Sequence, residues 1–215
     1  MKYHEERERL VKHLKNSGYI NTDKVYDAMN KVPRHIFLPD NLKDHAYVDS
    51  PQPIGGGQTI SAPHMVAMMV EALDLDIGQR VLEIGGGRGY HAAVIAELVG
   101  KEGQVYTVEL IEGLAKEARK NLRDASYSNV KVILGDGSKG YSKEAPYHRI
   151  SVACGAPAVP PPMLEQLKVG GKLLIPLGGS FHQELLLFTK TMEGKIKKKG
   201  LGGVLFVPLR GEHGF

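Results

Sequence analysis

The stretch Arg80–Tyr90, RVLEIGGGRGY, decides the fold of this 215-residue chain. Its first half predicts a buried strand over Val81–Ile84, and glycines then stand at positions 85, 86, 87 and 89. A helical pattern follows at once over 90–99. Glycine lets the backbone approach a ligand closely, and a helix start offers free N–H groups to it. The stretch therefore predicts a strand, turn and helix that bind a nucleotide.

Strand and helix patterns alternate from residue 80 to the end of the chain. Six further strands are predicted at 105–110, 130–134, 150–153, 172–176, 184–189 and 203–209, and further helices at 112–124 and 161–168. Apolar strands separated by helices are typical of a mainly parallel sheet with helices on both faces. The last strands follow one another through short polar turns. We therefore expect an α/β fold whose seven-stranded sheet ends in an antiparallel hairpin.

The first third of the chain predicts helices and irregular segments. Residues 4–16 are amphipathic, and a second short helix begins after Asn21 or Thr22. The segment 33–53 is rich in proline and is expected to be irregular. Ser61 and Pro63 open a third helix that runs to about residue 73, because serine before an early proline is a helix start signal.

Composition and charge exclude several classes of protein. The chain has 28 basic and 24 acidic residues, a formal charge of +4, and 42% hydrophobic residues, enough to form a core. Its apolar runs are shorter than a membrane span, and its charged first residues do not resemble a signal peptide. The single cysteine, Cys154, fits a reducing compartment. We expect a cytoplasmic protein without a membrane partner.

Metal and nucleic-acid partners are also not expected. The nine histidines contain no HxxxH pair, and one cysteine cannot form CxxC. The basic run at 195–199 stands between two strand patterns and lacks aromatic partners. We interpret it as a solvated hairpin turn.

Two spacings of the loop glycines favour different nucleotides. The dinucleotide pattern GxGxxG/A fits Gly87, Gly89 and Ala92, but it starts late after the strand. The pattern GxGxG fits Gly85, Gly87 and Gly89, and the acid Glu83 precedes it. This second spacing is typical of enzymes that use S-adenosylmethionine.

Acidic residues follow the next two strands. Glu109 ends the second strand, where a carboxylate can accept both ribose hydroxyls of either kind of nucleotide. Asp136 and Gly137 follow the third strand, where an acid can accept a hydrogen bond from an adenine amino group. A surface acid at Glu109 and a plain turn at 135–137 are the alternatives. Successive strand ends line one crevice in open α/β sheets, so the glycine loop, Glu109 and Asp136 are expected to contact one ligand. The GxGxG spacing together with these two acids favours S-adenosylmethionine as that ligand.

With these residues in view, the chain resembles the protein-L-isoaspartate O-methyltransferase family. The matching segments keep the family's order and span nearly the whole chain: VPRHIFLPD (32–40), AYVDSPQPIGGGQTIS (46–61), VLEIGGGRGY (81–90), GDG (135–137) with Gly140, EAPYHRI (144–150) and FVPL (206–209). Two departures stand out. The loop reads GGGRGY where the family usually has GTGSGY or GSGSGY, and His148 replaces the usual Asp.

The resemblance implies a class I, Rossmann-like methyltransferase fold in a single domain, 1–215. Residues 1–75 would form a helical and substrate-loop subregion, and 76–215 the cofactor-binding core. The implied reaction moves a methyl group from S-adenosylmethionine to the α-carboxylate of L-isoaspartyl residues in damaged proteins, which leaves S-adenosylhomocysteine and starts repair through a succinimide. We expect a monomer. A methyltransferase of another carboxylate or small molecule, a dehydrogenase and a non-catalytic or RNA-associated binding protein are the alternatives.

The pattern and the resemblance together assign residues to three roles. Ser61 matches the family's active-site serine, although a helix N-cap would equally explain it. Cofactor contacts are expected from Glu83, Gly85, Gly87, Gly89, Tyr90, Glu109, Leu110, Asp136 and Gly137. Substrate contacts are expected from Ile54, Gly57, Thr59, Ile60, His64, Val207, Pro208 and Leu209. The glycines at 55–57 would form a mobile substrate-covering loop or a simple surface connection, and Cys154 would pack or line the site.

Overall fold

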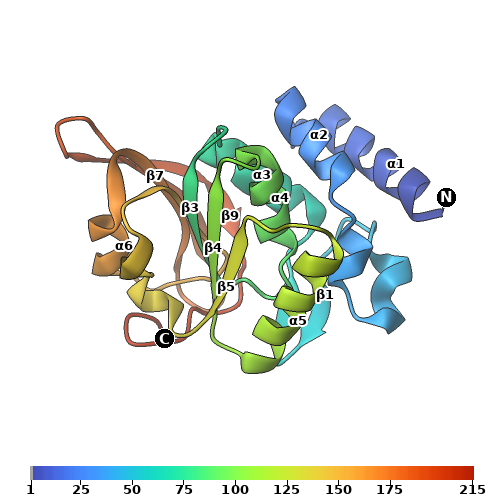
Figure 1. Cartoon of the computed structure of the whole chain (residues 1–215). Coiled ribbons are helices and arrows are strands. Elements are labelled where there is room, and N and C mark those ends of the chain that lie inside the picture. The colour runs from blue at the N-terminus through green and yellow to red at the C-terminus, as the bar shows by residue number, and fades with distance from the viewer. Residues whose placement is uncertain (1) are drawn as a thin grey trace.

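The computed structural model describes residues 2–215 and has a seven-stranded sheet at its centre (Figure 1). The strands lie in the order β5-β4-β3-β6-β7-β8-β9. Their bounds are β3 (Arg80–Ile84), β4 (Gln104–Glu109), β5 (Val130–Leu134), β6 (Tyr147–Val152), β7 (Leu167–Gly178), β8 (Gln183–Lys190) and β9 (Ile196–Val204). The strands from β5 to β7 pair in parallel, and β8 is antiparallel to both neighbours. The predicted mainly parallel sheet with an antiparallel edge is confirmed.

Helices cover both faces of this sheet. α3 (Pro63–Leu73), α4 (Tyr90–Val99) and α5 (Glu112–Asp124) pack on one face, and the short α6 (Pro161–Glu165) packs on the other. α1 (Lys2–Asn16) and α2 (Asp23–Lys31) lie outside α3 and α4 (Figure 1). The Thr22 side chain caps α2 by accepting a hydrogen bond from the Val25 N–H, as the sequence predicts.

The last strand lies earlier in the chain than the sequence predicts. The predicted strand at 203–209 is wrong, because β9 ends at Val204. The later residues form an isolated bridge from Pro208 to Gly155, and Phe206 hydrogen-bonds to the Gln183 side chain of β8. The basic run is therefore not a hairpin turn, since Lys197–Lys199 lie within β9. β9 is an edge strand, where lysine side chains hinder pairing with a second sheet.

The segment 33–60 is more regular than predicted. It contains two 3₁₀ helices, Arg34–Phe37 and Asp40–His45, followed by a small hairpin of β1 (Gln52–Gly55) and β2 (Gln58–Ile60). Glycines 55, 56 and 57 all have positive φ, between 60° and 93°, which the turn of this hairpin requires. Among residues 2–215, no helix is both long and apolar enough to cross a bilayer.

Candidate active site

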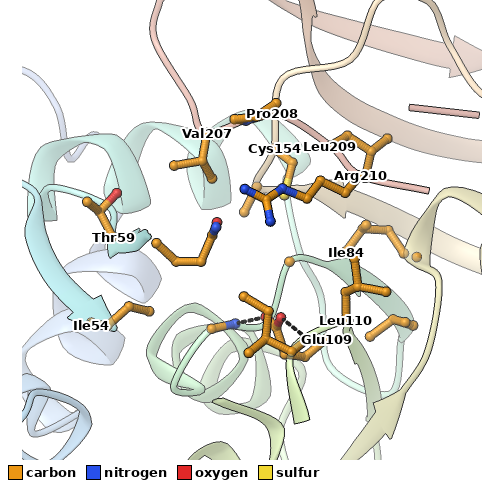
Figure 2. Close-up of a pocket in the computed structure, with 17 residues that line it drawn as sticks. Ile54, Thr59, Ile84, Glu109, Leu110, Cys154, Val207, Pro208, Leu209 and Arg210 are labelled. Atoms are coloured by element: carbon orange, nitrogen blue, oxygen red, sulfur yellow. Dashed lines mark hydrogen bonds between the residues drawn. The ribbon is translucent and has the colours of Figure 1, made fainter. Parts of the chain in front are cut away.

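Four parallel strands end at one cavity, which we call the strand-end cavity (Figure 2). Gly85 follows β3, Leu110 follows β4, Gly137 lies beyond β5, and Cys154 follows β6. β3 pairs with β4 on one side and β6 on the other, so the order of the strands reverses here. Ligands of open α/β sheets bind at this kind of switch point.

The Glu109 carboxylate connects two backbone segments that line the strand-end cavity. Its carboxylate accepts hydrogen bonds from the Gly87 N–H at 2.7 Å and the Ile111 N–H at 2.8 Å (Figure 2). Burial raises the pKa of Glu109, while these backbone hydrogen bonds act in the opposite direction. The carboxylate therefore links the glycine loop to the start of α5, and it lines the cavity beside them.

Positive φ and close contacts favour glycine at two positions of the loop. Gly85 has a φ of 86°, and a Cβ there would lie 2.6 Å from the Cys154 sulfur. Gly87 has a φ of 53°, and its Cβ would lie 3.1 Å from Ile54. Gly89 caps α4, where a Cβ would meet Leu122 at 3.1 Å, so it serves helix packing outside the cavity.

The opposite wall of the strand-end cavity comes from two segments far apart in the sequence. Ile54, Gln58 and Thr59 belong to the β1–β2 hairpin, and 207–210 belong to the C-terminal segment. Figure 2 shows the Arg210 guanidinium reaching over the cavity from the side of Pro208 and Leu209. The sequence reasoning missed six of the lining residues: Gln58, Ile84, Val108, Ile111, Ala153 and Arg210.

A groove and an inner cavity adjoin the strand-end cavity, and Ser61 lines both. The Ser61 groove is lined by Pro51, Thr59, Ser61, Ala62, His64, Met65, Ala153 and 203–207. The inner cavity is lined by Ile54, Thr59, Ile60, Ser61, Val66, 85–88, Tyr90, His91 and Ala153. Thr59 and Ala153 line all three spaces, so these spaces meet beside Ser61.

The Ser61 side chain does not cap a helix, so that alternative is wrong. The N-cap of α3 is Ala62, one residue later, and it provides no side-chain hydrogen bond. The Asp49 carboxylate serves the helix start instead, because it accepts hydrogen bonds from the His64 N–H and Nδ1, both at 2.9 Å. His64 is thereby fixed in the wall of the Ser61 groove. The serine hydroxyl remains available to a ligand.

Tyr90 is a core residue as well as part of the inner cavity wall. Its ring packs against Phe37 with centroids 5.8 Å apart, and its hydroxyl points at the Met29 sulfur, 3.7 Å away. Burial raises the pKa of Tyr90 to about 12. Most of the Tyr90 ring therefore packs in the core, and only the part that lines the inner cavity could contact a ligand.

Glu83 lies outside the three spaces, which corrects the prediction of a direct cofactor contact. Side chains alternate along β3, so Glu83 points toward α4, whereas Ile84 lines the strand-end cavity. The carboxylate is fully buried, 3.3 Å from the His91 Nδ1 atom. Thr107 and Ser151 flank it in register on β4 and β6. Glu83 therefore belongs to a buried polar row beneath the glycine loop.

This row explains why glycine stands at position 86. A Cβ at Gly86 would overlap the Thr107 hydroxyl, which is buried and has no hydrogen-bond partner among residues 2–215. We expect Gly86→Thr to destabilise the protein by about 2 kcal/mol through overpacking, and Thr107→Ala to relieve most of that loss in the double variant. Urea unfolding of the four proteins measures this coupling. Equal destabilisation by Gly86→Thr in both backgrounds would contradict it.

Asp136 also lies outside the strand-end cavity, although its neighbour Gly137 lines it. One carboxylate oxygen accepts hydrogen bonds from the Ser138 N–H and hydroxyl, and the other from the Glu212 N–H at 2.9 Å. Against the effect of burial, these bonds hold the pKa of Asp136 below its ordinary value. The side chain thereby anchors the C-terminal segment that carries Arg210, and the expected adenine contact stays a prediction.

The two sequence departures are accommodated away from the strand-end cavity. Arg88 turns outward, donating to the Phe37 carbonyl at 3.0 Å and pairing with Glu117 at 3.1 Å. His148 lies at the start of β6, where its Nδ1 accepts a hydrogen bond from the Arg80 N–H.

Gly57, one of the residues expected to contact the substrate, is exposed in the hairpin turn and lies outside the three spaces.

Cys154 lines the strand-end cavity as an inert thiol. Burial raises the pKa of Cys154 to about 12, and the nearby carboxylates of Glu109 and Glu83 add to this effect. Because the thiolate is the reactive form, we expect iodoacetamide at pH 8 to modify the folded protein at least about 100-fold more slowly than the unfolded chain. Intact-protein mass spectrometry follows the reaction. Equal rates in buffer and in urea would contradict the assignment.

Comparison with known proteins identifies the fold and the family. A family model described as protein-L-isoaspartate(D-aspartate) O-methyltransferase matches residues 5–214. A protein-L-isoaspartate O-methyltransferase of Methanopyrus kandleri is 60% identical over 97% of this chain and 93% of its own length. One from Archaeoglobus fulgidus is 55% identical over 100% of this chain and 97% of its own length.

A solved structure agrees with these relatives. A Plasmodium falciparum protein described as a protein-L-isoaspartate O-methyltransferase, in complex with S-adenosyl-L-homocysteine, superposes with a TM-score of 0.85 at 29% identity. The match covers 95% of this chain and 98% of that one. The class I methyltransferase fold expected from the sequence is confirmed. The chain belongs to the protein-L-isoaspartate(D-aspartate) O-methyltransferase family.

Proposed function

We propose that this protein transfers a methyl group from S-adenosylmethionine to the α-carboxylate of L-isoaspartyl residues in damaged proteins. The observation that carries the assignment is the meeting of the strand-end cavity and an open groove beside Ser61. A donor in the cavity and a peptide in the groove would face each other across Thr59 and Ala153. The matches to isoaspartate methyltransferases along nearly the whole chain support this donor and acceptor.

The strand-end cavity suits S-adenosylmethionine. We assign the ribose hydroxyls to the Glu109 carboxylate, since that side chain already lies at the tip of β4. The apolar walls of Ile84, Leu110 and Ile111 suit a purine ring, with Gly137 allowing close approach. The backbone at Gly85 and Gly87 would adjoin the remainder of the cofactor. When bound, the cofactor supplies an electrophilic methyl group on a sulfonium.

The Ser61 groove suits the peptide acceptor. A carboxylate is ionised near neutral pH, so the acceptor needs orientation and exclusion of water rather than a general base. We propose that the Ser61 hydroxyl donates a hydrogen bond to the acceptor carboxylate. Thr59 and Ile60 would position the isoaspartyl residue, and His64 with 205–207 would flank the peptide on the opposite walls. Val207 lines both the groove and the strand-end cavity, and with Pro208 and Leu209 it would contact the peptide where the groove meets the cofactor.

We further propose that 1–75 and 76–215 act as the acceptor and donor sides of one domain. One cluster of buried residues includes side chains of α1, α2, α3, α4 and the sheet, which supports this arrangement. We propose that the protein works as a cytoplasmic monomer without metal or nucleic acid. The moderate charge of +4 supports the part of this proposal that concerns nucleic acid.

A paired-peptide assay tests the proposed reaction. Two peptides of one sequence, with L-isoaspartate or L-aspartate at one position, are incubated with enzyme and labelled S-adenosylmethionine. We expect base-labile methyl ester only in the isoaspartyl peptide. Equal labelling of both peptides would favour a general carboxylate methyltransferase, and binding of NADH in preference to S-adenosylhomocysteine would favour a dehydrogenase. Either result would overturn the proposal.

A further inference from the structure

Arg34 is a charged residue in the core behind Ser61. Its side chain is 1% exposed and lies at the start of the 3₁₀ helix Arg34–Phe37. Nε donates a hydrogen bond to the Ala46 carbonyl, and Nη2 donates one to the Ser61 carbonyl, both at 2.9 Å. The guanidinium carbon lies 4.8 Å from the centroid of the Tyr90 ring, within the range of a cation–π contact. Arg34 thus joins Ser61 to the first residue of α4.

The charge of Arg34 is not neutralised by a neighbouring acid. Among residues 2–215, no carboxylate lies within 4.0 Å of the guanidinium, and the Nη1 atom is buried without a hydrogen-bond partner. Asp49 acts on Arg34 at longer range, but its carboxylate is hydrogen-bonded to His64. Burial lowers the pKa of Arg34, yet a guanidinium keeps its proton in proteins.

An unpaired buried cation is costly, because desolvation removes its hydration and no ion pair replaces it. Such a charge raises the electrostatic potential in the cavity and groove beside it. Ser61 lines both the inner cavity and the groove, and its carbonyl is the atom that Arg34 contacts. An anionic group held at Ser61 would therefore be stabilised by Arg34 without touching it.

We propose that Arg34 is a positioning residue that fixes Ser61 and gives the groove its preference for a free carboxylate. The inference rests on the proposed function, since it names the group that distinguishes the acceptor. An isoaspartyl residue presents a free α-carboxylate, whereas the same residue with an α-carboxamide has nearly the same shape and no charge. Arg34 distinguishes these two ligands by charge, and its hydrogen bond to Ser61 sets the position of the serine.

Arg149 provides a matched control at the other end of the same helix. It is also buried, and it donates to the Leu73 carbonyl at 2.6 Å and to the Asp74 carbonyl at 2.9 Å. Both arginines therefore tie an end of α3 to the body of the protein by bonds to backbone carbonyls. Only Arg34 lies next to the groove, so only its charge should affect the choice of ligand.

The test measures the dissociation constants of two peptides that carry isoaspartate as the free acid or as the α-carboxamide. The enzyme is saturated with S-adenosylhomocysteine, so neither peptide reacts. We expect Arg34→Met and Arg34→Gln to weaken binding of the acid about tenfold and leave the carboxamide unchanged. Arg34→Lys should keep the preference for the acid but lower kcat, because lysine cannot reproduce both hydrogen bonds. Arg149→Met should lower stability and leave the preference intact.

Two outcomes would overturn the proposal. One is an unchanged ratio of the two dissociation constants in Arg34→Gln, which keeps a hydrogen-bond donor and tests charge even if Arg34→Met does not fold. The other is an equal loss of preference in Arg149→Met, which would make the effect structural. Failure of the wild-type enzyme to methylate the isoaspartyl peptide would contradict the proposed function instead, so the two failures are distinguishable.

Discussion

Glu109→Gln is expected to weaken S-adenosylhomocysteine binding about 100-fold, because hydrogen bonds from the two ribose hydroxyls to a carboxylate are lost. The amide keeps only one oxygen, so its NH2 group would also face one of the two backbone N–H groups, of Gly87 or Ile111, that now donate to the carboxylate. Isothermal titration calorimetry measures the affinity. Glu112→Gln is the control, since Glu112 is an exposed acid at the start of α5 that pairs with Lys116.

The pH dependence of binding gives a second test of Glu109. Its pKa is raised, so in the free enzyme the carboxyl takes up a proton at a higher pH than an ordinary glutamate. Ribose hydroxyls stabilise the ionised form, so binding below this pKa releases the proton. Affinity should therefore fall as the pH drops through the raised pKa of Glu109, and this dependence should be weaker in Glu109→Gln. Equal affinities of wild type and Glu109→Gln at pH 7 would exclude the ribose assignment.

The donor side of the site was predictable because its signals are local. A buried strand followed by Gly85 and Gly87 fixes the turn, and the next strand places Glu109 at the same edge of the sheet. Glu83 was assigned from the same motif, but strand alternation places it on the opposite face from Ile84. Counting faces along Val81–Ile84 would have identified Glu83 as a buried residue facing α4.

The other wall depends on contacts between distant parts of the chain. Arg210 reaches the cavity because Asp136, 76 residues before Glu212, holds the C-terminal segment. Likewise, β9 includes the lysine run because pairing with β8 overrides the low strand propensity of lysine. The role of Arg34 was hidden for the same reason, since its partners Ala46 and Ser61 are 12 and 27 residues away. Periodicity and short motifs contain no signal for such pairings.

Ser61→Ala is expected to lower kcat/KM for the isoaspartyl peptide about 100-fold, because the hydroxyl orients the acceptor carboxylate toward the methyl group and a small misplacement of the reacting atoms can cost this factor. S-adenosylhomocysteine affinity should remain near that of the wild type, because the contacts at Glu109 and Gly87 are untouched. The free energy of unfolding should change by less than about 0.5 kcal/mol, since the hydroxyl does not cap α3.

Ser61→Thr separates the hydroxyl from the space around it. If the hydroxyl orients the acceptor, the threonine variant should recover part of the activity that Ser61→Ala loses, because it keeps the donor and adds one methyl group. Steady-state methylation of the isoaspartyl peptide, normalised to the fraction of enzyme that binds S-adenosylhomocysteine, measures both variants. Full turnover in Ser61→Ala would mean that orientation comes from the backbone of 59–61, held by Arg34 at the Ser61 carbonyl, and that the hydroxyl is dispensable.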